Sequence, residues 1–439
     1  MQKCDVLVIG GGPAGSTVSS FLAEHGWSVT QLEKDTHPKF HIGESLLPMN
    51  LPIFEKLGLL EQIHEIGILK YGVEFNCTSR EKPTTYYFKN ALNKNHPHAY
   101  EVQRDKFDKI LFENARQKGV LGLETTRVTD IEFQQDESCV VHVKDEQGNT
   151  STWHARYLID ASGRGTVLGN KFKTKHRSKE HSSAAVFGHF SGVERRAGKD
   201  EGNISIYWFE HGWFWFIPFK DGTMSVGAVC WPYYLNSRKV GVEQFLMDTL
   251  KLCPAAQQRM ARAKLISPVT ATGNFSYKLE KMYGKGYLII GDAFAFIDPV
   301  FSSGVLFSMN AAMFAADVVD GLLKNPADAN KLLKDYDRTI RYGLKTFSWF
   351  IYRITQPAMR KMFMMPQNRF RVEEGILSLL SGDIFGDTKI KFPLFMFKVI
   401  YRISYLMNWR VNRDAYSRRL DSLRGGEALV EDASSEVTS

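Results

Sequence analysis

The sequence predicts an α/β fold with three parts: a β-α-β unit at the N-terminus, an antiparallel sheet in the middle and a mostly helical C-terminal region. Three observations predict it. Residues 5–32 read as strand, helix and second strand. Residues 183–231 alternate in polarity and are rich in Gly, Phe and Trp, as in antiparallel sheets. Residues 330–415 carry helical patterns, and 439 residues are enough for two or three lobes.

Composition and cysteine usage exclude several classes of protein. A chain that is 44% hydrophobic and 24% charged is neither fibrous nor mostly disordered. The five cysteines are widely spaced without a CxxC pair, so we expect no disulfide framework and no metal site. The sequence has no signal-peptide pattern and no long uncharged apolar run. We therefore expect a cytoplasmic protein that is at most peripheral to a membrane.

The N-terminal unit carries a glycine fingerprint for a dinucleotide. Residues 5–9 form a short β-rich run, and Gly10, Gly12 and Gly15 follow it where the helix opens. The first glycine permits a tight turn, the second lets a pyrophosphate approach the backbone, and the third lets helix and strand pack closely. The helix N-terminus then holds the anion through its free N–H groups. The loop residues between these glycines that we expect to contact the cofactor are Pro13 and Ala14.

An acid at the end of the second strand completes this fingerprint. Glu33 is placed to accept hydrogen bonds from a ribose, and its charge disfavours a 2′-phosphate. Lys34 follows it and is expected to lie at the same site. Strand, helix, second strand and terminal acid together predict a Rossmann-like domain, whereas a glycine-rich turn alone would be weak evidence.

Two later strands end in polar turns that suit a flavin nucleotide. Asp160 ends a strand before a Gly-containing turn, and Gly291-Asp292 ends another. An acid after a buried strand can bind a polyol such as ribityl. With these turns and with Arg104 in the segment VQRDKFD, residues 1–350 resemble the two-domain FAD monooxygenase superfamily. The resemblance implies FAD as the cofactor.

Three further segments resemble the flavin-dependent halogenases of the phenol/pyrrole-type branch. They are HIGESLLP at 41–48, WFWFIP at 213–218 and FIDPVFSSG at 296–304. Two tryptophans at spacing two lie on one strand face, where they form either an aromatic wall beside a flavin or ordinary core packing. The resemblance implies flavin contacts at Gly43, Glu44 and Ser45, and substrate or tunnel positions at Trp213, Trp215, Pro218 and Phe301.

The resemblance also implies a reaction and its residues. A separate reductase would supply FADH2, which would use O2 and chloride or bromide to make hypohalous acid, and Lys70 would receive it. Without the family match, Lys70 would be read as a solvated strand-end charge. Backbone N–H groups of Ser303 and Gly304 could bind the halide. Phe301 stands where tryptophan halogenases have a glutamate, which favours an electron-rich phenol or pyrrole over free tryptophan.

Other functions remain open from the sequence alone. A hydroxylase or an isoprenoid-type reductase could use the same scaffold, and a degenerate member could bind flavin without turnover. His98 and His211 are candidate bases, although a lone histidine is more often structural.

The net charge of +8 is concentrated near the C-terminus. Residues 338–416 hold 14 Lys and Arg against five acids. This segment could cap the substrate cavity, dock an acidic acyl- or peptidyl-carrier protein that presents the aromatic substrate, or touch a membrane surface. Nucleic acid is not expected as a partner, because no binding fold is readable.

These patterns predict a Rossmann-like FAD-binding domain with an inserted antiparallel β-sheet substrate domain and a mostly helical C-terminal region. The expected divisions are a discontinuous FAD-binding domain at 1–75, 96–175 and 270–345, a substrate domain at 76–95 and 176–269, a helical cap at 346–423 and a disordered tail at 424–439.

Overall fold

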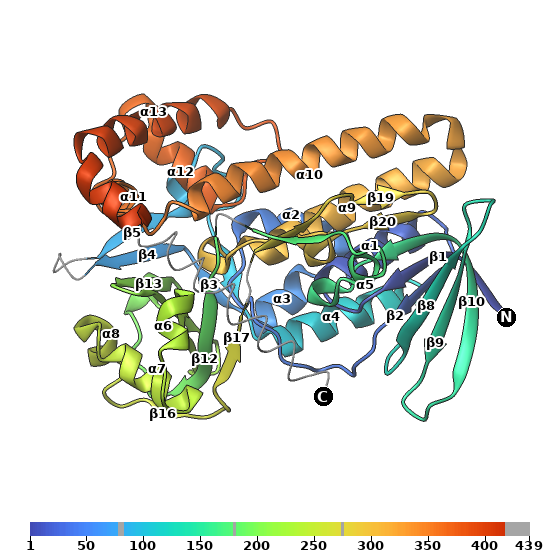
Figure 1. Cartoon of the computed structure of the whole chain (residues 1–439), viewed down its shortest axis with the longest axis horizontal. Helices are drawn as coiled ribbons and strands as arrows, with labels where there is room; N and C mark the ends of the chain where they lie inside the picture. The colour runs from blue at the N-terminus through green and yellow to red at the C-terminus, as the bar shows by residue number, and fades with distance from the viewer. Residues whose placement is uncertain (78–82, 179–180, 274–275, 418–439) are drawn as a thin grey trace.

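The computed structural model describes residues 1–77, 83–178, 181–273 and 276–417, so the tail expected at 424–439 lies outside the described residues. It has the α/β organisation that the sequence predicts: two large sheets, with helices packed on them (Figure 1). The first sheet lies near the N-terminus at one end of the molecule, and the second lies below the C-terminal helices at the other end.

The first sheet has a parallel centre, as expected from the β-α-β unit, and antiparallel strands added to it. Its order is β19-β20-β10-β1-β2-β7, and β8 and β9 extend it as a hairpin from β10. The register pairs Ile9 of β1 with Asp160 of β10 and Asp160 with Ile289 of β20, so the turns after these three strands meet at one edge. The strands are β1 (Gln2–Ile9), β2 (Val29–Leu32), β7 (Leu121–Leu123), β8 (Arg127–Phe133), β9 (Cys139–Lys144), β10 (Thr150–Asp160), β19 (Tyr283–Gly284) and β20 (Tyr287–Ile289).

Helices cover this sheet, and α1 packs against α9 and α4. Helix α9 is long and apolar enough to cross a membrane by length and composition, but 72% of its most apolar window is buried inside the protein. That burial is the environment of a core helix. The helices of this part are α1 (Pro13–Glu24), α2 (Leu51–Leu57), α3 (Leu60–Ile66), α4 (Arg104–Gln117), α5 (Val167–Lys171), α9 (Ser303–Lys324) and α10 (Ala329–Ile351).

The second sheet has two apolar faces with different neighbours. Its order is β16-β12-β15-β14-β13-β4-β5, with β17 beside β12. One face, which carries Phe214 and Phe216, packs on the short helices α6–α8, whereas the other face carries Trp213 and Trp215 and joins a core shared with the C-terminal helices. The strands are β4 (Gly72–Cys77), β5 (Thr84–Tyr87), β12 (Ala184–Ser191), β13 (Ile204–Phe209), β14 (Gly212–Pro218), β15 (Met224–Cys230), β16 (Lys264–Leu265) and β17 (Thr270–Thr272). The helices are α6 (Pro232–Asn236), α7 (Val242–Leu250) and α8 (Pro254–Arg259).

Two small sheets and the C-terminal helices complete the described chain. The order β11-β18-β21 forms one small sheet, and β3 pairs with β6 in the other. Helices α11–α13 lie over β4 and β5 (Figure 1). The remaining elements are β3 (Ile68–Lys70), β6 (Ala99–Glu101), β11 (Lys175–Arg177), β18 (Tyr277–Leu279), β21 (Ala295–Phe296), α11 (Pro357–Met364), α12 (Val372–Leu380) and α13 (Lys391–Met407).

Three of the expected domain boundaries fall in the wrong place. The boundary after residue 75 cuts β4, which pairs with β13 of the second sheet along its length. The boundary at residue 270 assigns β17 to the first domain, yet β17 pairs with β12. The boundary after residue 345 cuts α10. The domain to which a strand belongs depends on its pairing with strands that are distant in sequence. A local sequence pattern does not reveal that pairing.

Candidate active site

A cavity of about 430 Å³ lies between the two sheets and contains most of the predicted site residues. It opens along the edge where the turns after β1, β10 and β20 meet, and it reaches the tryptophan face of the second sheet. The predicted residues that line it are Gly10, Gly12, Pro13, Ala14, Glu33, Lys34, Gly43, Glu44, Ser45, Arg104, Trp213, Trp215, Asp292 and Gly304. The predicted residues that do not line it are Gly15, Lys70, Asp160, Pro218, Gly291, Phe301 and Ser303.

The three fingerprint glycines have different surroundings. A Cβ on Gly12, at the N-terminus of α1, would meet no atom within 4 Å, so this backbone faces open cavity. A Cβ on Gly15 would stand 2.0 Å from the carbonyl oxygen of Gly10, because helix and turn touch there. Gly10 has a φ of +110°, which disfavours side chains. The turn therefore leaves the helix N-terminus accessible to an anion.

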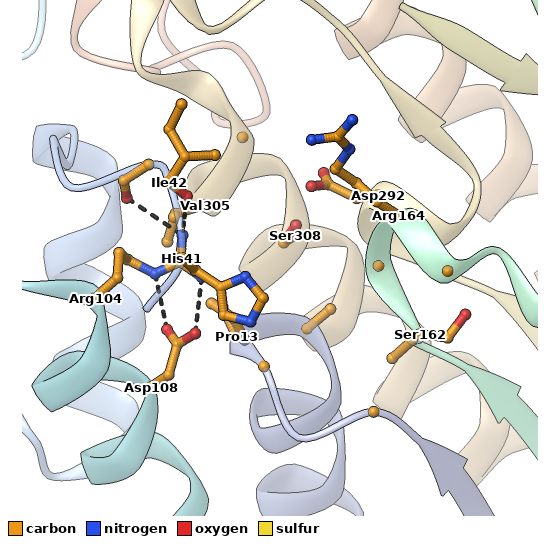
Figure 2. Close-up of a pocket in the computed structure, with 18 of the residues that line it drawn as sticks. Pro13, His41, Ile42, Arg104, Asp108, Ser162, Arg164, Asp292, Val305 and Ser308 are labelled. Atoms are coloured by element: carbon orange, nitrogen blue, oxygen red, sulfur yellow. Dashed lines mark hydrogen bonds and ion pairs between the residues drawn. The ribbon is translucent and has the colours of Figure 1, made fainter. Parts of the chain in front are cut away.

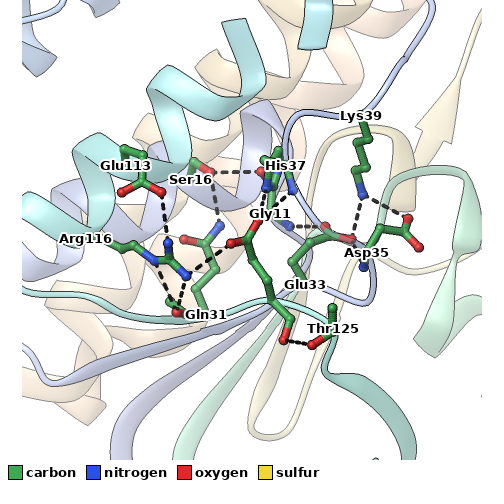
Figure 3. A network of polar contacts seen from close by, with 12 residues as sticks. Gly11, Ser16, Gln31, Glu33, Asp35, His37, Lys39, Glu113, Arg116 and Thr125 are labelled. Atoms are coloured by element: carbon green, nitrogen blue, oxygen red, sulfur yellow. Dashed lines mark hydrogen bonds and ion pairs between the residues drawn. The ribbon is translucent and has the colours of Figure 1, made fainter. Parts of the chain in front are cut away.

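Glu33 lies at the centre of a polar network beside this turn (Figure 3). Its Oε2 accepts from Gly11 N–H at 2.7 Å, and its Oε1 accepts from Lys39 Nζ at 2.6 Å. Burial alone would raise the pKa of Glu33, but the Lys39 ammonium and these hydrogen bonds hold it below its ordinary value. Glu33 is thus an ionised acceptor at the cavity wall, as ribose recognition requires.

Arg104 fixes the segment 41–45, which crosses the cavity (Figure 2). Its Nη1 donates to the carbonyl of Ile42 at 2.7 Å, while its Nε and Nη2 form a bidentate pair with Asp108 at 2.8 and 2.9 Å. A Cβ on Gly43 would lie 2.9 Å from Arg104 Nη1, so glycine is needed for this close approach. A buried charged group therefore holds the backbone of this segment, while the side chains of Glu44 and Ser45 bond to His189 and Lys70.

Asp292 and Arg164 lie together at another wall of the cavity (Figure 2). Burial raises the pKa of Asp292 to about 7, although Arg104 and Arg164 act in the opposite direction. A carboxyl group that titrates near neutrality can either donate a hydrogen bond to a hydroxyl or accept one from it. Asp292 thus suits a polyol, as its position after β20 predicts.

Asp160 and Gly291, two of the predicted cofactor contacts, lie behind the cavity wall. The Asp160 carboxylate is fully buried and accepts from the N–H groups of Ser162 and Leu168 at 3.0 and 2.7 Å, so it shapes the turn whose residues line the cavity. A Cβ on Gly291 would lie 3.0 Å from Ser308 Oγ on α9. Both residues support the wall without facing the cavity.

The tryptophans of β14 form an apolar wall of the cavity. Trp213 and Trp215 lie on one face with ring centroids 6.0 Å apart, and both are 4% exposed. The indole N–H of Trp215 donates to Ser225 Oγ at 3.1 Å. Pro218 and Phe301 do not line the cavity, and Phe301 instead stacks on Phe363 of α11 at 6.0 Å. Both residues are buried, and their tunnel roles stay predictions.

The N-terminus of α9 also opens into the cavity. Ser302 and Gly304 line it, and a Cβ on Gly304 would meet nothing within 4 Å. The Ser303 side chain is buried away from the cavity, so only its backbone could serve an anion there. The preceding turn is anchored by Asp298, whose carboxylate accepts from Ser183 Oγ at 2.6 Å and contacts the ring of His181 at 2.8 Å.

Lys70 is buried, which contradicts the reading as a solvated strand-end charge. It ends β3, is 0% exposed, and its Nζ donates to Ser45 Oγ at 2.7 Å and to the carbonyl of Leu46 at 2.9 Å. Desolvation lowers the pKa of Lys70 although Glu101 raises it in part. Because Ser45 lines the cavity, one hydrogen bond separates the amine from the cavity wall.

Some candidates lie elsewhere, and sequence reasoning missed others. His98 and His211 do not line the cavity. His41 does, and burial with the nearby Arg104 lowers its pKa to about 4, so it stays neutral. Arg164 also lines the cavity, and its place in the turn after Asp160 could have indicated it. No cluster of metal-ligating side chains occurs among the described residues.

The sequence matches the FAD binding domain family over residues 3–342. A flavin-dependent halogenase of Armillaria mellea is 30% identical over 410 residues, which cover 86% of this chain and 78% of that protein. A 1H-pyrrole-2-carbonyl-[peptidyl-carrier protein] chlorinase of Pseudomonas fluorescens is 26% identical and covers 88% of this chain and 91% of its own length.

Solved structures share the fold. A flavoprotein/dehydrogenase from Cytophaga hutchinsonii superposes with a TM-score of 0.85 at 26% identity, covering 93% of this chain and all of that one. The myxobacterial chondrochloren halogenase superposes with a TM-score of 0.78 at 29% identity, covering 92% and 97%.

Proposed function

The chain belongs to the FAD binding domain family and, within it, to the flavin-dependent halogenases, and from this premise we propose that Lys70 transfers the halogen to an electron-rich phenol or pyrrole. The observation that carries the proposal is the burial of Lys70 one hydrogen bond behind the cavity wall. The reduced FAD, which we propose a separate reductase supplies, would yield hypohalous acid from O2 and chloride or bromide.

The residues of the cavity fit FAD. The open backbone at Gly12 suits the pyrophosphate, and the ionised Glu33 suits the adenosine ribose. Asp292 suits the ribityl chain. The apolar wall of Trp213 and Trp215 suits a flat ring, and it would keep a second aromatic molecule from reaching that ring.

The N-terminus of α9 supports the halide proposal. Ser302 turns the chain with a φ of +56°, and the helix then begins at Ser303. The first N–H groups of a helix have no partner within the helix, so those of Ser303 and Gly304 can bind an anion where the cavity wall is open. These two residues would hold the halide beside the flavin.

The burial of Lys70 gives it the reactivity that halogen transfer needs. A protonated amine has no lone pair, and desolvation favours the neutral form. A neutral buried amine can take an electrophilic halogen, and an ammonium can polarise hypohalous acid by a hydrogen bond. In either route the halogen must pass Ser45, because Ser45 lines the cavity and its Oγ accepts a hydrogen bond from Lys70 Nζ.

The substrate class rests on what stands at position 301. Phe301 supplies no carboxylate and packs on Phe363, so a substrate whose ring is activated by loss of its own O–H or N–H proton is favoured. A phenol or a pyrrole meets that demand. A chlorinase of Pseudomonas fluorescens that is similar to this chain is named for a pyrrole held on a peptidyl-carrier protein, which supports a tethered pyrrole in particular.

Helix α13 and its C-terminal neighbours offer a docking face for an acidic carrier. Phe395, Leu406 and Met407 are 61%, 69% and 79% exposed, and basic residues such as Arg402 and Arg410 are exposed beside them. Carrier binding should therefore weaken with salt and with the double charge reversal Arg402→Glu and Arg410→Glu. The same reversal at Lys144 and Lys285, in the other part of the molecule, is the control. If both double variants bind the carrier protein equally well, this face is not the docking site. If the wild type binds anionic vesicles but no carrier protein, the face is a membrane surface.

The test of the function is product analysis with a flavin reductase, FAD, O2, bromide and a panel of free and carrier-bound phenols and pyrroles. We expect bromine isotope patterns in the products. Lys70→Ala and the volume-preserving Lys70→Met should bind FAD and give no halogenated product, while Lys109→Ala, an exposed lysine on α4, should behave as the wild type. Halogenation by Lys70→Ala at the wild-type rate would refute the role of Lys70.

A second candidate is hydroxylation or reduction of the substrate, including an isoprenoid-type reductase. The similarity to the Cytophaga hutchinsonii flavoprotein/dehydrogenase favours it. The same product analysis separates the two: hydroxylated or saturated products that form equally without halide would establish the second candidate. FAD that binds but is never turned over on any substrate would indicate a flavin-binding protein without catalysis.

A further inference from the structure

Glu101 is a buried acid whose carboxylate has no hydrogen-bond partner. It ends β6, is 0% exposed, and neither of its oxygens is within hydrogen-bond distance of a partner among the described residues. A buried carboxyl group that lacks hydrogen bonds is costly, so its presence in the core calls for an explanation. Its Oε1 lies 3.8 Å from Lys70 Nζ.

The strand pairing places this acid beside the proposed reacting amine. In the β3–β6 pair, Lys70 faces Ala99 and Glu101 faces Ile68, so Lys70 and Glu101 are diagonal neighbours on one face. Ser45 bridges to Glu101 on the other side of β6 and accepts the hydrogen bond from Lys70. The acid, the amine and the hydroxyl that faces the cavity therefore form one contiguous group.

The surroundings favour a neutral amine beside a neutral acid. Lys70 Nζ contacts Ser45, the Leu46 carbonyl and Glu101, and the Phe88 ring centroid lies 5.6 Å away. The groups that act on Glu101 are Lys70, Ser45 and the like-charged Glu44. Burial raises the pKa of Glu101 to about 8 and lowers that of Lys70, so both shifts favour the uncharged pair.

We propose that Glu101 is the proton donor and acceptor of Lys70 in halogen transfer, an assignment that rests on the proposed function of Lys70. As the amine takes the halogen from hypohalous acid, the O–X bond breaks and a hydroxide leaves. The Glu101 carboxylic acid protonates that hydroxide to water, and the resulting carboxylate takes the proton that the halogenated amine must lose. The products are Lys70 haloamine, water and the restored acid.

The transfer to the substrate closes the proton balance. The ring carbon takes the halogen as the N–X bond breaks, and the ring proton passes to the amine nitrogen. Lys70 and Glu101 are then as they began. The group thus needs only the hypohalous acid and the aromatic substrate. It also supplies from β6 a carboxyl group that this chain lacks at Phe301.

The test is Glu101→Gln, which keeps the shape of the side chain and removes the exchangeable proton. General acid–base catalysis contributes about 10²- to 10⁴-fold, so we expect a fall in halogenation kcat of about 100-fold or more, with FAD still bound. Glu101→Asp should recover part of the rate because it keeps an acid on a shorter arm. Glu61→Gln, an exposed glutamate on α3, is the matched control and should match the wild type.

The pH profile separates proton transfer from a structural role. The wild-type halogenation rate should fall as pH rises through the range where Glu101 loses its proton. The Glu101→Gln variant should be slower throughout, and its rate should not fall in this pH range. Ionisation of hypohalous acid itself would leave the fall in both. A wild-type profile without an alkaline fall refutes the assignment even if the variants do not fold. If Glu101→Gln is fully active and Lys70→Ala is inactive, the proton-transfer role of Glu101 is refuted and the role of Lys70 stands. If Lys70→Ala is fully active, the proposed halogen transfer by Lys70 is refuted.

Discussion

The two glycines at the start of α1 should respond in opposite ways to the same substitution. Gly12 faces the open cavity with a φ of −84°, which alanine adopts readily, and its added methyl would meet no protein atom within 4 Å. Gly15 lies on the same helix, but its added methyl would stand 2.0 Å from the carbonyl oxygen of Gly10. Gly12→Ala should therefore weaken FAD binding, whereas Gly15→Ala should destabilise the folded protein.

The contacts set the expected magnitudes. A methyl forced into occupied space costs about 1–3 kcal/mol, so Gly12→Ala should weaken FAD binding about 10- to 100-fold and leave the unfolding free energy of the FAD-free protein unchanged. A backbone oxygen cannot rotate away as a side chain can. Gly15→Ala should therefore lower the unfolding free energy by about 3 kcal/mol or more, because α1 must move off β1.

The assay is flavin fluorescence titration together with thermal melting of the FAD-free proteins. Gly241→Ala is the matched control, since Gly241 begins α7 outside the cavity and a Cβ there meets nothing within 4 Å. It should leave FAD affinity unchanged and affect the melting no more than Gly12→Ala does, because both glycines are the N-cap of a helix. Wild-type FAD affinity in Gly12→Ala would refute the placement of the pyrophosphate, and wild-type melting of Gly15→Ala would refute the close packing.

Further predictions concern the other walls of the cavity. Asp292→Ala should weaken FAD binding about tenfold through the loss of one hydrogen bond, while Asp292→Asn should retain most of the affinity, as titration would show. Gly227→Ala should destabilise the protein by about 1–3 kcal/mol in melting experiments, because its methyl would lie 2.3 Å from the Trp215 ring. Burial alone would lower the pKa of His189, but its hydrogen bond to Glu44 at 2.8 Å raises it overall. The stabilisation should be full below pH of about 6.5 and be lost as pH rises through the raised pKa of His189, a dependence that His189→Gln should abolish.

Much of the flavin site was predictable because local rules govern it. The order of strand, glycine turn, helix and acid fixes how Gly12 and Glu33 meet a nucleotide, and both line the cavity. The spacing of Trp213 and Trp215 likewise places both rings on one strand face. Asp160 shows what such reasoning leaves out: the carboxylate accepts hydrogen bonds from N–H groups of its own turn, and a sequence pattern does not reveal that orientation.

The sequence by itself determined the fold class, the cofactor family and the residues that a strand or helix period places on one face, because those depend on neighbours in the chain. The tertiary structure alone decided which strands belong to which sheet, and that Lys70 is buried. It also decided that Phe301 packs into the core and that the buried Glu101 lies beside Lys70. These outcomes depend on desolvation and on contacts between residues far apart in the chain. Only the packed molecule sets the environment that makes an amine and an acid reactive.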